Sequence, residues 1–181
     1  MKKLILSIII VAFSFSSYAQ NSSIFDKFED YDEVTTVVVT KQAFKMLKKI
    51  SSDSEEGKEF QNLVEGLNDL KVFTTEDSKI ASEMQSIFNQ YLKKEKMVEL
   101  MRVKDKDANV KIYIREGKDD EHVSEFLMLV DEMNINHNGN RADAEVVVIS
   151  LTGDIDLNNI SKITKEMNIP GGEHMKKAEK K

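Results

Sequence analysis

The sequence predicts an α+β fold: a single domain with an antiparallel or mixed β-sheet and helices packed mainly on one face. In the first half of the chain, several segments place their apolar residues at helical spacing. From Met97 onwards the apolar residues follow the two-residue period of strands, in four consecutive runs. The segments between these runs are polar and rich in turn residues, which favours a C-terminal four-strand meander of antiparallel hairpins.

The first nineteen residues, 1–19, have the features of an export signal. Lys2 and Lys3 precede the apolar run 4–13, and small residues, Ser17 and Ala19, stand at the −3 and −1 positions of a cleavage site. The run is too short to span a membrane, which takes about 20 apolar residues. We therefore expect cleavage near Ala19, no membrane insertion afterwards, and a protein that is periplasmic or secreted.

Composition excludes several classes of function. Without residues 1–19 the chain keeps 24 basic residues (26 less 2) against 32 acidic ones, a net charge of −8, which disfavours nucleic acid and anionic lipid as partners. The absence of cysteine excludes thiol nucleophiles, thiolate metal sites, disulfides and lipid attachment. One proline and seven glycines argue against repeats and Gly-rich phosphate loops. Residues 20–169 fit one domain, which apolar packing alone must stabilise.

The first half of the chain predicts alternating helices and strands. Residues 34–40 are almost all β-branched, as strands favour. Residues 42–50 place Ala43, Met46, Leu47 and Ile50 on one helical face. The expected elements, in order, are a short helix from Ser22 or Ser23 to about Tyr31, a strand at 34–40, helices at 42–50 and 55–65, a strand at 67–75, and a long helix from Asp77 or Ser78 to about Lys94.

The second half predicts four strands and a final helix. The strands are expected at 97–103, 110–115, 123–130 and 145–152, separated by polar segments at 104–109, 116–121 and 131–144. Residues 146–151 show no alternation, which indicates a central strand covered on both faces. Asp156 then caps a closing helix whose inward residues are Leu157, Ile160, Ile163 and Met167. Residues 170–181 are expected to form a disordered tail.

Three stretches carry a recognisable pattern of strands and caps: 93–103, 110–115, and 148–157 running into 160–162. In these stretches the chain resembles the domain-of-unknown-function 4252 family, exported proteins of Bacteroidota, over roughly residues 24–168. The resemblance implies an exported single domain and gives no residue an activity. Some relatives carry a lipid-attachment cysteine that this chain lacks, so the resemblance does not imply a lipid anchor.

One loop suggests a metal site. Asn134, Asn136, Asn138 and Glu145 have the spacing of oxygen ligands in a helix-loop-helix calcium loop, with Gly139 at its turn position. Weak calcium sites suffice outside the cell, where calcium is millimolar. The loop offers few carboxylates, however, and Glu145 begins an expected strand. A hairpin loop that uses Asn and Gly for their backbone tolerance is the simpler interpretation.

No catalytic signature is present. The three histidines are His122, His137 and His174, and none belongs to a His-Glu-x-x-His or similar ligand pair. The sequence also lacks the Gly-x-Ser-x-Gly pattern of serine hydrolases. An unrecognised hydrolase would need a concave pocket that gathers carboxylates with His122 or His137.

The sequence therefore favours an exported interaction or structural domain that is not an enzyme and needs no cofactor. A protein partner or self-association is expected, because continuous apolar strands need cover on both faces. The calcium-responsive module is the first alternative and the hydrolase the second.

Overall fold

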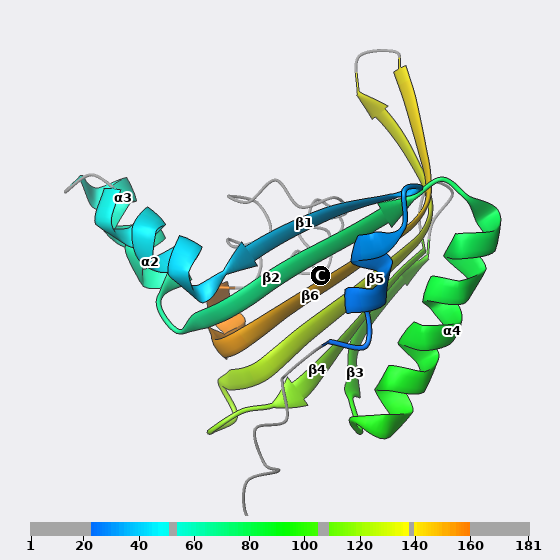
Figure 1. Cartoon of the computed structure of the whole chain (residues 1–181). Coiled ribbons are helices and arrows are strands. Elements are labelled where there is room, and N and C mark those ends of the chain that lie inside the picture. The colour runs from blue at the N-terminus through cyan, green and yellow to red at the C-terminus, as the bar shows by residue number, and fades with distance from the viewer. Residues whose placement is uncertain (1–22, 51–53, 105–108, 138–139, 160–181) are drawn as a thin grey trace, which may run out of the picture.

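A computed structural model describes residues 23–50, 54–104, 109–137 and 140–159, which build one six-stranded antiparallel β-sheet (Figure 1). The strand order is β1-β2-β6-β5-β4-β3. The strands are β1 (Val34–Thr40), β2 (Leu67–Thr75), β3 (Val98–Lys104), β4 (Asn109–Glu116), β5 (His122–His137) and β6 (Asn140–Asp156). Since β3 to β6 are neighbours in chain order, the predicted meander is confirmed, and the sheet is antiparallel rather than mixed.

The described helices are η2 (Asp26–Asp30, a 3₁₀ helix), α2 (Lys41–Ile50), α3 (Glu55–Val64), α4 (Ser78–Lys94) and η3 (Leu157–Asn159, a 3₁₀ helix). Helices α3 and α4 begin at the capping residues that the sequence predicts, whereas the first short helix begins at Asp26, after Phe25, and not at Ser22 or Ser23. The Asp77 side chain accepts hydrogen bonds from the backbone N–H groups of Lys79 and Ile80, which fixes the start of α4. Ser54 caps α3 in the same way, through the N–H of Gly57. No helix among the described residues is long and apolar enough to cross a membrane.

Helix α4 and η2 cover one face of the sheet (Figure 1). Phe25 and Phe28 from the η2 segment and Met84 and Phe88 from α4 are fully buried there. They pack against Phe73 of β2 and against Leu127, Leu129, Val146 and Val148 of β5 and β6. The rings of Phe25 and Phe73 lie 6.2 Å apart, centroid to centroid. Large aromatic side chains thus close this part of the face.

The opposite face carries a second apolar cluster, to which α2 and α3 contribute through Phe44, Leu63 and Val64. Both helices lie beyond the end of β1 and β2 (Figure 1). The core of β6, from Val146 to Leu151, is buried on both faces and lies between β2 and β5, as predicted for a central strand. Helix α4 and η2 therefore lie over one face of the sheet, and the α2–α3 hairpin adds to the cluster of the other face at one end.

The expected apolar face of α2 is wrong in part. Phe44 is its buried residue, whereas Met46 and Ile50 are 66% and 74% exposed. Because α2 packs at the end of the sheet and not across it, only part of its circumference meets the protein. Helical spacing alone could not show which apolar residues would be covered.

Strands β5 and β6 are longer than predicted. Within the expected polar loop 131–144, residues 131–137 continue β5 and residues 140–144 belong to β6, and the two strands pair from Asp131↔Val146 to His137↔Asn140. Ladder hydrogen bonds join backbone groups, so polar side chains do not prevent pairing. The predicted signal at 1–19, the closing helix beyond Asn159 and the tail at 170–181 lie outside the described residues.

Candidate functional site

The α4-side face of the sheet changes character along its strands. On β2, the residues of this face run from Phe73 through Lys71 to Asp69, and on β6 from Val148 through Ser150 to Thr152. The register pairs Lys71 with Ser150 and Asp69 with Thr152, while Glu125 of β5 lies opposite both Thr152 and Arg115 of β4. We call Asp69, Lys71, Ser150, Thr152, Glu125 and Arg115 the polar half of this face, and the part covered by α4 and η2 the apolar half.

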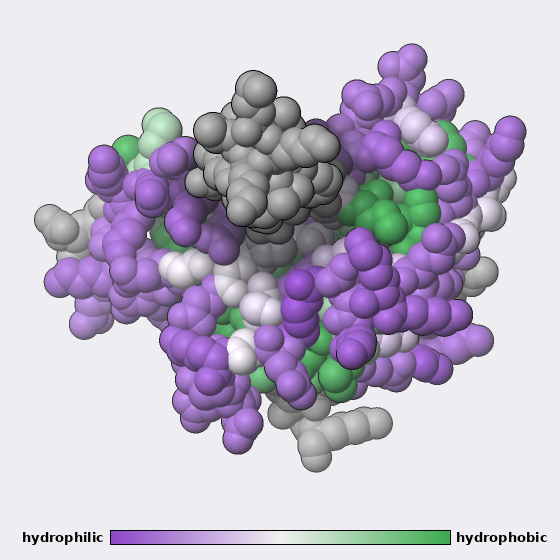
Figure 2. Space-filling model, turned by 60° about the horizontal axis from the view of Figure 1, so that its bottom comes forward, coloured by the Kyte–Doolittle hydropathy of each residue, from purple (hydrophilic) through white to green (hydrophobic). Residues whose placement is uncertain are grey.

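The polar half forms the floor of a cleft of about 800 Å³. Ser23 and Ile24 line it beside η2, and Tyr91, Lys94 and Glu95 line it at the C-terminal end of α4. Figure 2 shows the molecule with the bottom of Figure 1 turned forward, and hydrophilic side chains cover most of the surface that is visible in this view. The charged lining residues are four cations and three carboxylates: Lys41, Lys71, Lys94, Arg115, Asp69, Glu95 and Glu125.

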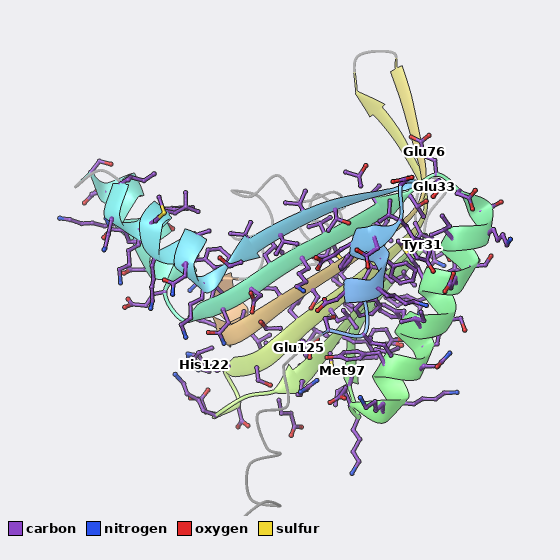
Figure 3. The ribbon with its side chains drawn as sticks, viewed as in Figure 1. Tyr31, Glu33, Glu76, Met97, His122 and Glu125 are labelled. Carbon is purple, nitrogen blue, oxygen red and sulfur yellow. The ribbon has the colours of Figure 1, made fainter. Side chains whose placement is uncertain are left out.

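Glu125, which is labelled in Figure 3, is the buried centre of a polar network in this cleft. Its side chain projects from β5, and the residue is only 4% exposed. The Tyr91 hydroxyl lies 2.9 Å from both carboxylate oxygens, and Arg115 Nη2 lies 2.7 Å from Oε2. Arg115 Nη2 also pairs with Glu95 Oε2 at 3.1 Å. Three elements, α4, β4 and β5, thereby meet at one carboxylate.

Burial sets the proton affinities in this network. It raises the pKa of Glu125 above the ordinary value of 4.5, although the Tyr91 hydrogen bond and the Arg115 charge oppose the shift. Burial also raises the pKa of Tyr91, and the adjacent Glu125 charge adds to the effect. Tyr91 therefore stays protonated and donates its hydrogen to Glu125.

Lys71 joins the polar half to η2. Its Nζ pairs with Asp26 Oδ1 at 2.5 Å and with Glu29 Oε1 at 3.2 Å. Partial burial opposes its charge, but the hydrogen bonds to both carboxylates outweigh this effect and raise the Lys71 pKa. The Lys71 ammonium is thus held at the boundary between the two halves of the face.

The backbone at the far end of the cleft requires glycine. Gly153 has a φ of +140°, and a Cβ placed on it would lie 2.3 Å from the carbonyl oxygen of Gly66. The same carbonyl accepts a hydrogen bond from the N–H of Asp154 at 2.9 Å. This close approach joins the beginning of β2 to β6 where the pairing between Leu67 and Asp69 shifts register.

The predicted calcium ligands lie on a β-hairpin. Asn134 and Asn136 are in β5, paired with Asp143 and Arg141, and Glu145 is in β6. Asn138 and the side chains of 132–145 lie outside the described part of the chain. Glu145 is five residues along β6 from Asn140, which at strand spacing is roughly 17 Å. The backbone does not bring Glu145 next to the hairpin tip, and calcium binding stays a prediction; calcium titration of the protein and of Glu145→Ala would test it.

The structure does not bring a histidine to the cleft among the residues it describes. His122 is the first residue of β5, where its Nδ1 is 2.6 Å from Asp119 Oδ1 of the preceding turn, and it is not part of the cleft lining. The side chains of His137 and His174 are outside the described residues. The cleft therefore gathers carboxylates without His122, the one candidate histidine that can be placed.

Sequence reasoning missed Tyr91, Arg115, Glu125 and Lys71. In the sequence Tyr91 fits the apolar stripe of its helix, and the other three residues lie in expected strands where no motif marks them. One signal was available, because Glu125 follows the same two-residue period as Leu127 and Leu129 and so occupies a position expected to be buried. A carboxylate at such a position needs polar partners.

Comparison with known proteins gives a family but no activity. No curated protein and no solved structure matches this chain. A family model described as "Domain of unknown function (DUF4252)" matches residues 28–163, which include all six strands and the cleft floor. The chain therefore belongs to the DUF4252 family.

Proposed function

We propose that this protein is an exported, non-enzymatic binding domain, and that a polar ligand occupies the cleft over the polar half of the sheet. The cleft carries the proposal: it is large enough for a small molecule, and a rigid antiparallel sheet forms its floor. The N-terminal export pattern supports a location outside the cytoplasm.

The chemistry of the lining favours a polar ligand over an apolar one. The polar residues Ser23, Ser124, Thr152 and Asp69 line the cleft. Four cations and three carboxylates line the same cleft, so it presents both hydrogen-bond donors and acceptors to a ligand. An alkyl chain would desolvate these groups without replacing their hydrogen bonds.

The arrangement of charges favours binding over catalysis. Glu125, the most buried carboxylate of the cleft, is already hydrogen-bonded to Tyr91 and paired with Arg115. A general base or nucleophile must instead reach the substrate and exchange its proton during the reaction. The network is better suited to holding α4 and the strands in fixed positions around a ligand.

Nuclear magnetic resonance can test this proposal directly. The ¹⁵N-labelled protein is titrated with monosaccharides, amino acids and dicarboxylates, each as a separate probe. We expect at least one class to shift the amide signals of Asp69, Ser124 and Thr152, and Thr152→Val to weaken the response. Glu116→Gln, an exposed change outside the cleft lining, serves as the matched control and keeps it.

Two results would count against the proposal. Shifts that avoid the cleft, or none with any probe, would contradict a ligand site there. Recovery of a binding probe as a new compound after incubation would contradict the non-enzymatic assignment.

A further inference from the structure

The two edges of the described sheet differ in how they are protected. Edge strand β3 carries Glu99, Arg102 and Lys104, and its pairing with β4 shifts register between Glu99 and Met101. Charges and bulges are the usual devices that prevent an edge from pairing with another strand. Val98 and Leu100 of β3 are exposed, but the charged residues and the register shift lie beside them.

Edge strand β1 has none of these devices within the residues 34–40. Its sequence is VTTVVVT, without charge or proline, and its ladder with β2 is regular from Val34 to Thr40. Each of the other four ladders has a register shift. Val37 and Val38, which point to opposite faces, are 49% and 41% exposed. A flat, uncharged edge with exposed valines is a template for strand addition.

The residues that flank β1 make this edge complementary to itself. An antiparallel pair of two β1 strands centred on Val37 places Val37 opposite its own copy and Thr36 opposite Val38. The same register places Glu33 of each copy opposite Lys41 of the other. Both residues are exposed and flank β1, Glu33 in the turn before it and Lys41, which also lines the cleft, as the first residue of α2. Their opposite charges therefore attract at both ends of the paired strands.

We propose that β1 pairs antiparallel with β1 of a second copy, in the register centred on Val37, to form a two-fold symmetric dimer. The two-fold axis passes through the Val37 pair perpendicular to the sheet. The two sheets therefore become one continuous antiparallel sheet. The α4 sides of both copies face the same way, so the two clefts open on the same side of the dimer. The proposal does not depend on what the cleft binds.

Single cysteines provide a register-specific test, because the chain has no cysteine of its own. In the proposed register, Val37→Cys places two thiols across the axis with Cβ atoms roughly 5 Å apart, close enough for a disulfide with small adjustment. Thr35→Cys is the matched control: it is exposed on the same face of β1, but its two copies lie roughly 13 Å apart along the strands. Under mild oxidation we expect Val37→Cys to form a covalent dimer and Thr35→Cys to remain a monomer on non-reducing gels.

Exchanging the charges of Glu33 and Lys41 tests the ends of the interface without changing the sequence of β1. The mass of the wild-type protein, measured by light scattering over a concentration series, is expected to rise to that of a dimer. Glu33→Lys alone places two lysines opposite each other and shifts the protein towards the monomer, and Lys41→Glu does the same with two carboxylates. The double exchange restores the dimer, while Glu116→Lys, an exposed control outside β1, leaves the wild-type mass unchanged.

Three outcomes would overturn the proposal. The wild type could stay monomeric at the highest concentration tested. The two cysteine variants could cross-link equally, as random collision predicts. The dimer could also survive each single charge reversal, which would place its interface or its register elsewhere. Circular dichroism of each variant identifies a change in fold, and the exposed Glu33→Lys keeps the test valid where Val37→Cys is poorly folded.

Discussion

The two halves of the α4-side face belong to the same strands but are closed by different forces. The apolar half is covered by aromatic rings from η2 and α4 packed on Phe73 and its neighbours. The polar half has no helix across it among the described residues, and its charged groups pair with one another at the rim and floor of the cleft. One sheet face thus separates the part that holds the apolar core from the part that forms the proposed binding cleft.

Tyr91 connects these two halves. Its ring packs 5.6 Å from the ring of Phe25 in the apolar half, while its hydroxyl bonds Glu125 in the polar half. Tyrosine suits such a boundary because one end of its side chain is apolar and the other is a hydrogen-bond donor. The position of α4 over the apolar half and the geometry of the cleft are therefore coupled through one residue.

The largest expected effect comes from the apolar half. Phe88 is fully buried, with its ring 6.4 Å from Phe25 and 5.8 Å from Tyr113. Phe88→Ala should lower the free energy of unfolding by about 4 kcal/mol, because it leaves a cavity between α4 and the sheet. Urea denaturation followed by circular dichroism measures the loss, with the exposed Asn89→Ala as control. A loss under about 1 kcal/mol would show that this half does not dominate stability.

A backbone change at the polar end should come next. Gly153→Ala should lower the free energy of unfolding by about 3 kcal/mol, because φ of +140° is strained for alanine and the new Cβ would meet the Gly66 carbonyl. Asp154→Ala is the neighbouring control, since it removes only an exposed pair with Lys118 and should cost under about 1 kcal/mol. Equal losses in the two variants would mean that the close approach of the chains is not what matters there.

Local sequence signals predicted most elements. The bounds of β1 and β2, the Asp77 cap of α4 and the central position of β6 follow from β-branched runs, a capping side chain and an apolar run without alternation. Each of these signals is contained within one short segment. They failed for α2, whose exposed Met46 and Ile50 depend on where the helix lies on the sheet.

The cleft could not be predicted in the same way. Tyr91 meets Glu125 across 34 residues and Arg115 across 24, so the network exists only when the strand register and the placement of α4 are both known. The sequence offered Glu125 within a buried period as its single indication. Loop motifs drew attention instead, although their residues lie on a hairpin away from the cleft.

Removing the central carboxylate should have an intermediate effect. Glu125→Ala leaves the Tyr91 hydroxyl and part of the Arg115 guanidinium without their shared partner, so the free energy of unfolding should fall by about 2 kcal/mol. This loss is smaller than that for a fully buried ion pair, because the Arg115 side chain is 38% exposed and still pairs with Glu95. Glu125→Gln, which still accepts a hydrogen bond, should lose about 1 kcal/mol. Thermal or urea unfolding of both variants checks the order; equal losses would show that the charge, which both variants remove, matters more than the hydrogen bonding.

The pH dependence of stability should show the buried state of Glu125. Its pKa is raised in the folded protein above the ordinary 4.5, so the folded state binds the proton more tightly than the unfolded state. This contribution is present below pH 4.5 and is lost as the pH rises from 4.5 through the folded pKa. The free energy of unfolding is measured for the wild type and for Glu125→Gln at several pH values. The advantage of the wild type over the variant should shrink as the pH rises above 4.5. If the difference between the two proteins did not change with pH, the pKa of Glu125 would be the same in the folded and unfolded states.

The smallest effect on stability is expected at the cleft floor, where the comparison between the two halves is sharpest. Thr152 is half-buried in β6, opposite Asp69 and Glu125, and valine has nearly its shape and its preference for strands. Thr152→Val should change the free energy of unfolding by no more than about 0.5 kcal/mol, while it weakens binding of any polar probe in the cleft. Phe88→Ala should show the opposite pattern, a large loss of stability with the binding of polar probes retained. The reason is that a variant that still folds keeps the residues that line the cleft. If Thr152→Val destabilised the fold as strongly as Phe88→Ala, the polar half would be structural and the division of labour across this face would not hold.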